Sequence, residues 1–484
     1  MEKHSSSGAQ FQRSLRLIDG VMLVSGVMIG SGIFIVSAEI ARTVGGVGYL
    51  MLVWILSGVM TIIGALSYGE LSGMFPHAGG QYVYLREALH PLIGFLYGWA
   101  FFLVIETGTI AAVAVAFAKY TAYLLPQIGE DYIIWQIGGF AVNRAQLLAI
   151  AMILFLTYVN TRGIRTGKWI QLIFTLAKIL ALLLLVILGL WIGFQPQVWR
   201  ANWHHAWNAF QVVFQNGQTI QQPSSGILLI GLTGVAMVGA LFSSDAWNSV
   251  TFIAAEIKKP EKNIGRSMFL GTLLVTIVYL LCNVMYVGVL SMHEIATAPA
   301  DRVASAAAGH FLGAWGAGLI AAMIMISTFG CNNGLVLSGA RVYYTMARDR
   351  LFFSPAGKLN EKGVPATALW LQGFWASLLC ISGKYSDLLN YVIFVVLIFY
   401  VLTILGIIRL RKTKPDLHRP YRAVGYPYLP VLYIVMAICI CISLLWLRPD
   451  YTWPGLIIVL IGIPVYYAFI RRQKSSSISS QRVV

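Results

Sequence analysis

Two short stretches of the sequence place polar residues and glycines inside long apolar runs. In "VMIGSGIFIV" (residues 27–36), a glycine-serine-glycine triplet stands where a membrane helix normally has large side chains. In "GALFSSDAWNS" (239–249), two serines and Asp245 interrupt a second run. Irregular backbone persists at membrane depth only beside protein or a water-filled cavity, and paired interruptions are typical of a secondary transporter's binding site. The first stretch alone is equally compatible with close helix packing, because Gly26 and Gly30 have the spacing of small residues at helix contacts.

Two ionisable residues lie deeper still in apolar segments. Lys178 is ten residues beyond Lys168, and a rise of about 1.5 Å per residue puts it roughly 15 Å deep, where a lysine needs polar partners. Glu106 lies in "FFLVIETGTIAAVAVAF" and has three open roles. It faces the substrate side chain and favours a cationic group, it takes part in proton coupling, or it pairs with a polar group of another helix such as the tenth.

The composition requires a membrane setting for these residues. Of 484 residues, 58% are hydrophobic and 11% are charged. Apolar segments of about 20 residues match a hydrocarbon core of about 30 Å. Twelve such segments are predicted, near residues 17–41, 49–74, 91–124, 145–161, 169–194, 226–256, 267–290, 304–340, 366–383, 387–408, 427–447 and 453–470, the eighth including a cytoplasmic helical extension.

Lysine and arginine predict the orientation of these spans. Placing the amino terminus in the cytoplasm gives the inner segments 26 of the 34 basic residues and the outer segments 6. This bias follows the positive-inside rule and predicts that both termini are cytoplasmic. It also accounts for the formal charge of +16 through short loops that face an anionic leaflet, so no nucleic-acid partner is expected.

Four motifs carry a resemblance to a known family. They are "GVMIGSGIF" in the first span, "SYGELSGMFPHAGGQYVYLREAL" after the second, "FSSDAWNSVTFIAAEIKKPEKNI" in the sixth and "KPDLHRPYRAVGYP" after the tenth. Together they resemble the L-type amino acid transporter branch of the amino acid, polyamine and organocation (APC) superfamily, over roughly residues 17–470, as a bacterial-type permease. The inner-loop motif, which includes Glu70 and "HAGGQY", is interpreted as gating architecture.

The resemblance implies an all-α polytopic membrane protein with twelve transmembrane helices, a five-plus-five inverted repeat, and discontinuous first and sixth helices. The predicted organisation is a cytoplasmic tail (1–16), a first repeat of spans 1–5 (17–194), a second repeat of spans 6–10 (226–411), spans 11 and 12 (427–470), and a second cytoplasmic tail (471–484).

The chemistry of an amino acid explains why these helices would break. Amides at a helix amino terminus suit a carboxylate, and carbonyls at the carboxyl end of a half-helix suit an ammonium. Glycine lets a substrate approach the chain closely. The predicted substrate-binding residues are Ile29, Gly30, Ser31, Gly32, Ile33, Phe242, Ser243 and Ser244.

Further roles rest on the resemblance. Phe242 matches the aromatic residue that closes over substrate. Lys178 stands where a lysine replaces the sodium ion of sodium-coupled relatives, and its ammonium is expected to bridge backbone around Gly30 and hydroxyls of the eighth span, most of all that of Ser327. Glu106 is a candidate for side-chain selectivity. Asp245 is expected to orient the broken segment through hydrogen bonds.

The predicted function is sodium-independent exchange or facilitated transport of neutral L-amino acids by alternating access, in the plasma membrane. The alternatives are a proton-coupled symporter that also accepts cationic amino acids, and a transporter-like amino-acid sensor, against which the short tails argue. Enzyme motifs are missing from the sequence, the eight histidines have no metal spacing, and no cofactor or metal is expected. The predicted partners are an amino-acid substrate and the lipid bilayer. A disulfide-linked heavy chain is not expected, because none of the five cysteines lies in a predicted external loop.

Overall fold

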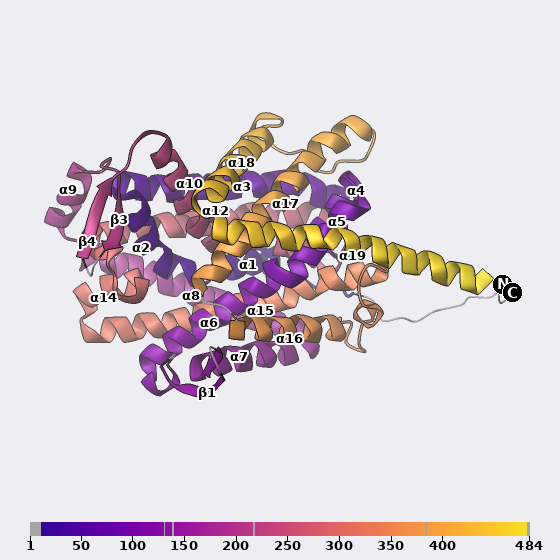
Figure 1. Cartoon of the computed structure of the whole chain (residues 1–484), viewed down its shortest axis with the longest axis horizontal. Coiled ribbons are helices and arrows are strands. Elements are labelled where there is room, and N and C mark those ends of the chain that lie inside the picture. The colour runs from indigo at the N-terminus through magenta and orange to yellow at the C-terminus, as the bar shows by residue number, and fades with distance from the viewer. Residues whose placement is uncertain (1–10, 130, 138–139, 216–217, 383–384, 482–484) are drawn as a thin grey trace.

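The computed structural model describes residues 11–129, 131–137, 140–215, 218–382 and 385–481, most of which form a bundle of long helices (Figure 1). Ten of the described helices are long and apolar enough to cross a membrane, and the bent pair α1–α2 makes an eleventh span. Helix α16 has 17 residues and corresponds to the remaining predicted span. The chain is therefore an all-α polytopic membrane protein, as predicted.

The elements up to the middle of the chain are α1 (Leu17–Met28), α2 (Gly32–Val44), α3 (Val47–Met74), α4 (Gln81–Ala88), α5 (Pro91–Ala100), the π-helical turn η1 (Phe101–Ile105), α6 (Glu106–Leu124), η2 (Pro126–Ile128), β1 (Ile133–Ile137), β2 (Phe140–Asn143), α7 (Arg144–Thr161), α8 (Ile164–Trp191), α9 (Pro196–His204), β3 (Phe210–Gln215) and β4 (Gln218–Pro223).

The remaining elements are α10 (Gly226–Ser243), α11 (Ser249–Phe252), η3 (Ala254–Glu256), α12 (Pro260–Val289), α13 (Met292–Ala296), η4 (Pro299–Asp301), α14 (Val303–Leu312), α15 (Ala314–Arg348), η5 (Ser354–Gly357), α16 (Ala366–Ser382), α17 (Tyr385–Thr413), α18 (Tyr428–Leu447) and α19 (Pro449–Gln481).

Each predicted span coincides with one of these helices or with a broken set of them. The eighth differs, because the predicted segment 304–340 is two helices, α14 and α15, that meet at Gly313. Gly313 has φ +61°, which glycine adopts without steric cost, and this residue ends α14. Helix α15 then continues to Arg348, beyond the predicted segment, as the expected extension.

Two other spans are broken where the sequence predicts interruptions. Helix α1 ends at Met28, α2 begins at Gly32, and the two axes differ by 44°. Helix α10 ends at Ser243, and helical structure resumes only at Ser249. Between them Ala246 adopts φ +61°, a left-handed conformation that an alanine rarely takes. The predicted inverted repeat stays a prediction.

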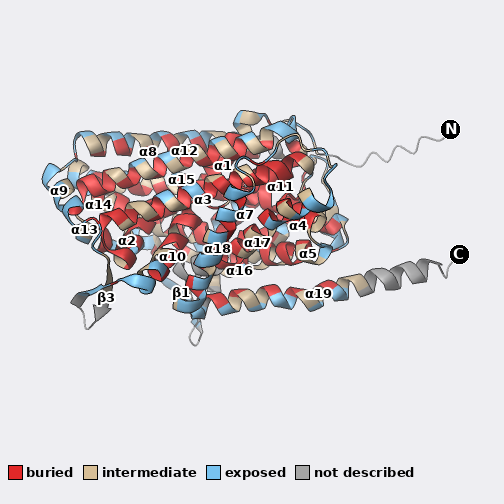
Figure 2. Cartoon of the chain, turned by 90° about the horizontal axis from the view of Figure 1, so that it is seen from above, coloured by how far each residue is buried: buried red, intermediate tan, exposed pale blue. Residues whose placement is uncertain are grey.

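Burial separates a central group of spans from a peripheral one. In the most apolar stretch of the span α5–η1–α6, 78% of the residues are buried, against 33% in α8 and 22% in α19. Figure 2 shows the same contrast, with red central helices and long pale stretches on α18 and α19. The exposed apolar side chains of the outer helices face the position of lipid, where they need no polar partner.

Two short antiparallel hairpins lie in connections between the spans. Strand β1 pairs with β2, and β3 pairs with β4. The hairpin β3–β4 gathers with α9 and α14 at one end of the bundle, and α4 lies at the other end (Figure 1). The second hairpin packs against α2, so it lies beside the broken first span.

The third span contains a local irregularity next to its one carboxylate. The π-helical turn η1 lies between α5 and α6 and ends directly before Glu106. The hydroxyl of Thr107 donates to the carbonyl of Phe102 at 2.6 Å, five residues back. Turns of this type occur often at functional sites, and this one sets the direction in which Glu106 leaves the helix.

Gly32 is a point of close approach between the two broken spans. A Cβ added to Gly32 would lie 2.7 Å from Cβ and 3.0 Å from Cα of Ser243, whereas one added to Gly30 would meet only Sγ of Cys331 at 3.4 Å.

We expect Gly32→Ala to push α2 away from α10 and to lower the free energy of unfolding by about 1–3 kcal/mol, and Gly30→Ala to lower it less. The melting temperature of the purified protein in detergent measures this difference. Equal melting temperatures for the two variants would contradict the packing argument.

Candidate functional site

The ammonium of Lys178, on α8, lies against the break in the first span. Its Nζ donates to the backbone carbonyls of Gly26 and Ile29, the second at 2.6 Å, and to the carbonyl of Ser327 on α15 at 3.3 Å. The side chain is only 1% exposed. Three acceptors match the three N–H bonds of an ammonium, so the buried charge is fully hydrogen-bonded and joins α1, α8 and α15.

Ser327 is brought to the break, as expected, but by a different atom. Its backbone carbonyl, not its hydroxyl, faces Lys178, and its Oγ donates to the carbonyls of Ile29 and Gly30, both at 3.0 Å. A hydroxyl has one proton, so Ser327 shares it between the carbonyls of Gly30 and Ile29, and the Ile29 carbonyl also accepts a bond from Lys178. In this conformation it is not available to a substrate ammonium, and its role as a ligand stays a prediction.

Tyr279, on α12, joins the two broken helices and was missed by the sequence analysis. Its hydroxyl lies 3.0 Å from the carbonyl of Met28 and 2.9 Å from that of Ser243, the last residues of α1 and α10. Both carbonyls belong to the last residue of a helix, and that of Met28 also accepts a bond from the Gly30 amide at 2.9 Å. One buried hydroxyl therefore caps both breaks.

The other predicted binding residues lie around this junction. Ser31, Gly32 and Ile33 are buried at the start of α2, at the positive end of the helix dipole. Phe242 and Ser243 form the last turn of α10, and the Ser243 hydroxyl donates back to Gly239 at 2.8 Å. Ser244 follows as the residue that ends the helix. The structure thus brings the first-span and sixth-span residues together.

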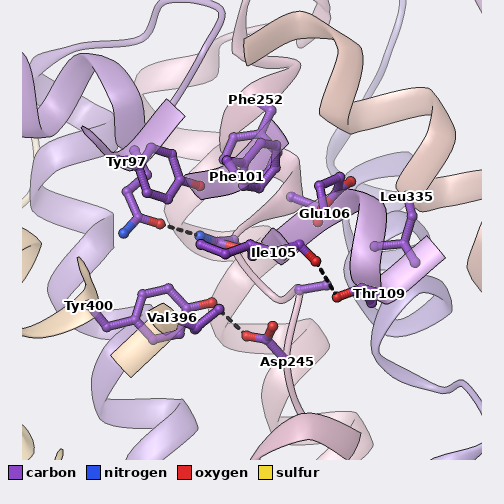
Figure 3. A pocket seen from close by; sticks show the side chains of 14 residues that line it. Tyr97, Phe101, Ile105, Glu106, Thr109, Asp245, Phe252, Leu335, Val396 and Tyr400 are labelled. Atoms are coloured by element: carbon purple, nitrogen blue, oxygen red, sulfur yellow. Dashed lines mark hydrogen bonds between the residues drawn. The ribbon is translucent and has the colours of Figure 1, made fainter. Parts of the chain in front are cut away.

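A small pocket lies beside the sixth-span break and contains both central carboxylates (Figure 3). Glu106 projects from α6 on one side, and Asp245 lies on the other, where it accepts a hydrogen bond from the Tyr400 hydroxyl at 2.6 Å. The cavity is about 20 Å³, room for about one water molecule. Its lining includes Glu106 but none of the other predicted site residues, so an amino acid would require this pocket to open.

A hydrogen-bonded chain closes one side of the pocket. The Asn248 amide donates to Oε1 of Gln81 at 2.8 Å, and the Gln81 amide donates to the Thr403 hydroxyl at 3.0 Å. Gln81 begins α4, directly after Gly79 and Gly80, whose positive φ angles (96° and 42°) turn the chain into the bundle. The motif "HAGGQY" therefore places one glutamine between the sixth-span break and α17.

Ion pairs surround this end of the bundle. The carboxylate of Glu70 on α3 is buried and accepts two bonds from Arg411 of α17, at 2.9 and 2.6 Å, and one from the amide of Ala423 at 2.7 Å. These contacts tie the motif after the tenth span to the second span. At the opposite end of the bundle, Arg42 pairs with Asp301 at 2.7 Å.

Helix α4 is held to the end of α15 in the same way. Arg86 and the Tyr82 hydroxyl both bond the carboxylate of Asp349. Burial alone would lower the pKa of the Arg86 guanidinium, but the Asp349 carboxylate beside it raises that pKa above its ordinary value. Burial, and then Asp349, raise the pKa of the Tyr82 hydroxyl. The guanidinium and the hydroxyl therefore both stay protonated at neutral pH.

The family model for amino acid permeases matches residues 15–468. The chain belongs to this family. The mouse large neutral amino acids transporter small subunit 2 is 31% identical over 88% of this chain and 75% of its own length. The mouse b(0,+)-type amino acid transporter 1 is 28% identical over 95% of this chain and 88% of its own. The serine/threonine exchanger SteT of Bacillus subtilis (strain 168) is 30% identical over 87% of this chain and 89% of its own length.

The family assignment confirms the resemblance seen in the four motifs, and it places the chain among membrane transporters rather than enzymes. Among the described residues, no group of three or more histidine, cysteine, aspartate or glutamate side chains could hold a metal ion. All five cysteines of the permease lie within membrane-spanning helices, in α12, α15, α16 and α18.

Lys178→Ala tests the buried ammonium of this permease. Removing one partner of a buried, hydrogen-bonded charge network costs about 3–5 kcal/mol, which corresponds to a loss of roughly 100-fold or more. We expect amino-acid uptake to fall by that factor. Lys178→Arg should rescue little, because a planar guanidinium does not fit three carbonyls around one point.

The measurement is initial uptake at matched surface expression, with Lys119→Ala, a partly buried lysine of α6, as the matched control. Near wild-type flux in Lys178→Ala would show that this lysine neither replaces sodium nor carries an obligatory proton.

Tyr279→Phe tests the shared cap. It removes the Tyr279 donor from the carbonyl of Ser243 and from that of Met28, which keeps its bond from the Gly30 amide at 2.9 Å. An unsatisfied buried group costs about 1–3 kcal/mol. We expect uptake to fall by about tenfold, while Tyr467→Phe on the exposed face of α19 stays close to wild type. The same flux assay compares the two variants, and equal rates would exclude a role for the hydroxyl.

Proposed function

We propose that this permease is a sodium-independent exchanger or facilitator of neutral L-amino acids and works by alternating access. The observation that carries the proposal is the meeting of two broken helices in a member of the amino acid permease family. Gly32, at the start of α2, lies against Ser243, at the end of α10. A helix amino terminus and a helix carboxyl end suit the carboxylate and the ammonium of one amino acid.

In the proposed binding mode, the amides of Ser31, Gly32 and Ile33 receive the substrate carboxylate. The carbonyls of Ile29 and of the segment Phe242–Ser244, with the space left by Gly30, receive the ammonium. Since Lys178 and Ser327 occupy the Ile29 carbonyl in this closed conformation, substrate binding requires these contacts to rearrange. Phe242, in the last turn of α10, is the proposed cover over the bound substrate.

Lys178 is the proposed substitute for sodium. Its ammonium bonds carbonyls of α1 and α15 at a place where a cation is needed to hold a broken helix. A covalently attached cation cannot leave with the substrate. Transport would then be driven by the concentration gradient of the substrate, or by the counter-transport of another amino acid, and would not require sodium.

The proposed location is the plasma membrane, with both termini in the cytoplasm. The bias of lysine and arginine toward one set of connections supports this orientation. It makes the end that carries α4, the Glu70 ion pairs and Asp349 the cytoplasmic gate. The proposed partners are the amino-acid substrate and the bilayer, without a disulfide-linked heavy chain, since no cysteine lies outside the spans.

A second candidate function rests on the charge of the pocket. Glu106 and Asp245 line it together, and none of its fourteen lining residues is lysine, arginine or histidine. A pocket with two carboxylates and no basic side chain favours a cationic group or a proton. This observation favours a transporter that accepts cationic amino acids, with or without proton coupling.

Proteoliposomes loaded with unlabelled amino acid test the leading proposal. We expect sodium-free uptake of labelled L-leucine that depends on amino acid inside, with competition by other neutral L-amino acids. Empty liposomes and loaded liposomes with Lys178→Ala are the controls.

A pH dye inside the vesicles distinguishes the alternatives. Proton entry driven by leucine would replace the exchanger with a symporter. Binding of leucine without flux would support the sensor instead.

A further inference from the structure

Two buried side-chain oxygen atoms lie close to Gly339 of α15, and neither has a hydrogen-bond donor in the described part of the chain. Among the described residues, neither Oε1 of Glu106 nor Oε1 of Gln372, on α16, has a hydrogen-bond partner. The two atoms lie 2.7 and 2.5 Å from the point that a Cβ on Gly339 would occupy, so they are neighbours over the bare backbone of α15. Both side chains are almost completely buried. A buried acceptor without a donor is costly, so a proton on Glu106 would supply the donor that both oxygens lack.

The orientation of the glutamine decides which residue supplies that hydrogen. The Nε2 amide of Gln372 donates to the carbonyl of Val336 at 3.3 Å, one turn before Gly339. Turning the amide over would set its oxygen against that carbonyl. Its Oε1 is therefore directed to Glu106, and an amide oxygen has no proton to give. A carboxylic acid does, so the arrangement is satisfied when Glu106 is protonated.

The groups around Glu106 support a protonated Glu106 beside a charged Asp245. The titratable side chains that face it are Asp245 at the sixth-span break, Tyr97 on α5, Cys331 and Tyr343 on α15, and Tyr400 on α17 across the pocket. The Asp245 carboxylate accepts a hydrogen bond from the Tyr400 hydroxyl at 2.6 Å, whereas Oε1 of Glu106 has no donor among the described residues. When two carboxyl groups share one buried pocket, a negative charge on one disfavours a negative charge on the other.

We propose that Glu106 is a proton-for-cation exchange site that distinguishes cationic from neutral amino acids. The inference rests on the proposed amino-acid transport and names the chemistry of its side-chain pocket. In the closed state the protonated Glu106 donates a hydrogen bond to Oε1 of Gln372. When an amino acid with a cationic side chain enters, its ammonium or guanidinium takes the place of that proton. The carboxylic acid becomes a carboxylate paired with the cation, and one proton is released to water.

A neutral side chain offers no such replacement, and Glu106 then keeps its proton. The net charge of Glu106 together with the group that it bonds is therefore zero with either class of substrate. Because the proton and the cation compete for one oxygen pair, the apparent affinity for lysine should rise about tenfold per pH unit while Glu106 is protonated. The affinity for leucine should not follow this slope.

Purified full-length permease in a weakly buffered solution with a pH indicator tests the proposal. We expect L-lysine to release about one proton per molecule bound and L-leucine to release none. Gln372→Leu removes the acceptor that holds the proton, so it should move the pH dependence of lysine binding to lower pH. Gln127→Leu, at an exposed position in η2, is the matched control and should leave the profile unchanged.

The outcomes separate this proposal from the proposed function. Lysine binding without proton release, lysine binding with a pH-independent affinity, or no lysine binding in protein that still exchanges leucine would each overturn the exchange site and leave amino-acid transport standing. The absence of exchange for both amino acids in proteoliposomes would instead overturn the proposed function, and this inference with it.

Discussion

The bond from the Lys178 ammonium to the Ile29 carbonyl permits the irregular backbone on which the rest of the site depends. A helix that stops at Met28 in the middle of a membrane leaves carbonyls unpaired, and each unpaired group costs several kcal/mol in hydrocarbon. Lys178, Ser327 and Tyr279 supply donors from three other helices, α8, α15 and α12. These three donors come from outside the broken span, and the amide of Gly30 adds a further bond to the Met28 carbonyl at 2.9 Å from within it. The break therefore depends on the positions of α8, α12 and α15.

The sixth-span break is stabilised differently, and this difference connects the two. Its last helical carbonyl, at Ser243, uses the same tyrosine hydroxyl as Met28, while Asp245 and Asn248 reach Tyr400 and Gln81. A hydroxyl has one proton, so at any moment Tyr279 donates fully to one carbonyl or shares its proton between two. A shift of either half-helix changes the cap of the other. Gln81 extends this dependence to α4 and its contact with Asp349.

Hydropathy predicts the spans well because a membrane helix needs only length and apolar composition. The broken triplet and Lys178 are also visible in the sequence, since two glycines around a serine interrupt a run of large apolar residues and a charge at membrane depth is rare. Tyr279 and Gln372 cannot be recognised in this way, because tyrosine and glutamine have many ordinary roles in packed helices. Tyr279 bonds backbone carbonyls, and Gln372 bonds a backbone carbonyl and lies near Glu106, so neither residue belongs to a sequence motif with a fixed spacing. The same limit explains Ser327, whose residue was predicted but whose bonding atom toward Lys178 was not. The break at Gly313 depends on one φ angle, which hydropathy does not record.

The contrast between the two buried charges follows from the chemistry of helices. A break in a helix exposes carbonyls at the end of its first half, and carbonyls satisfy a donor-only group such as an ammonium. Lys178 therefore finds three acceptors without a titratable partner. A carboxylate needs donors, and the intact helices around Glu106 have already used their amides. The neighbour that remains is the oxygen of Gln372, against Gly339, where any larger residue would fill the space. In the proposed exchange, Glu106 keeps its proton to bond this oxygen, and it releases the proton when the cationic side chain of a substrate takes its place.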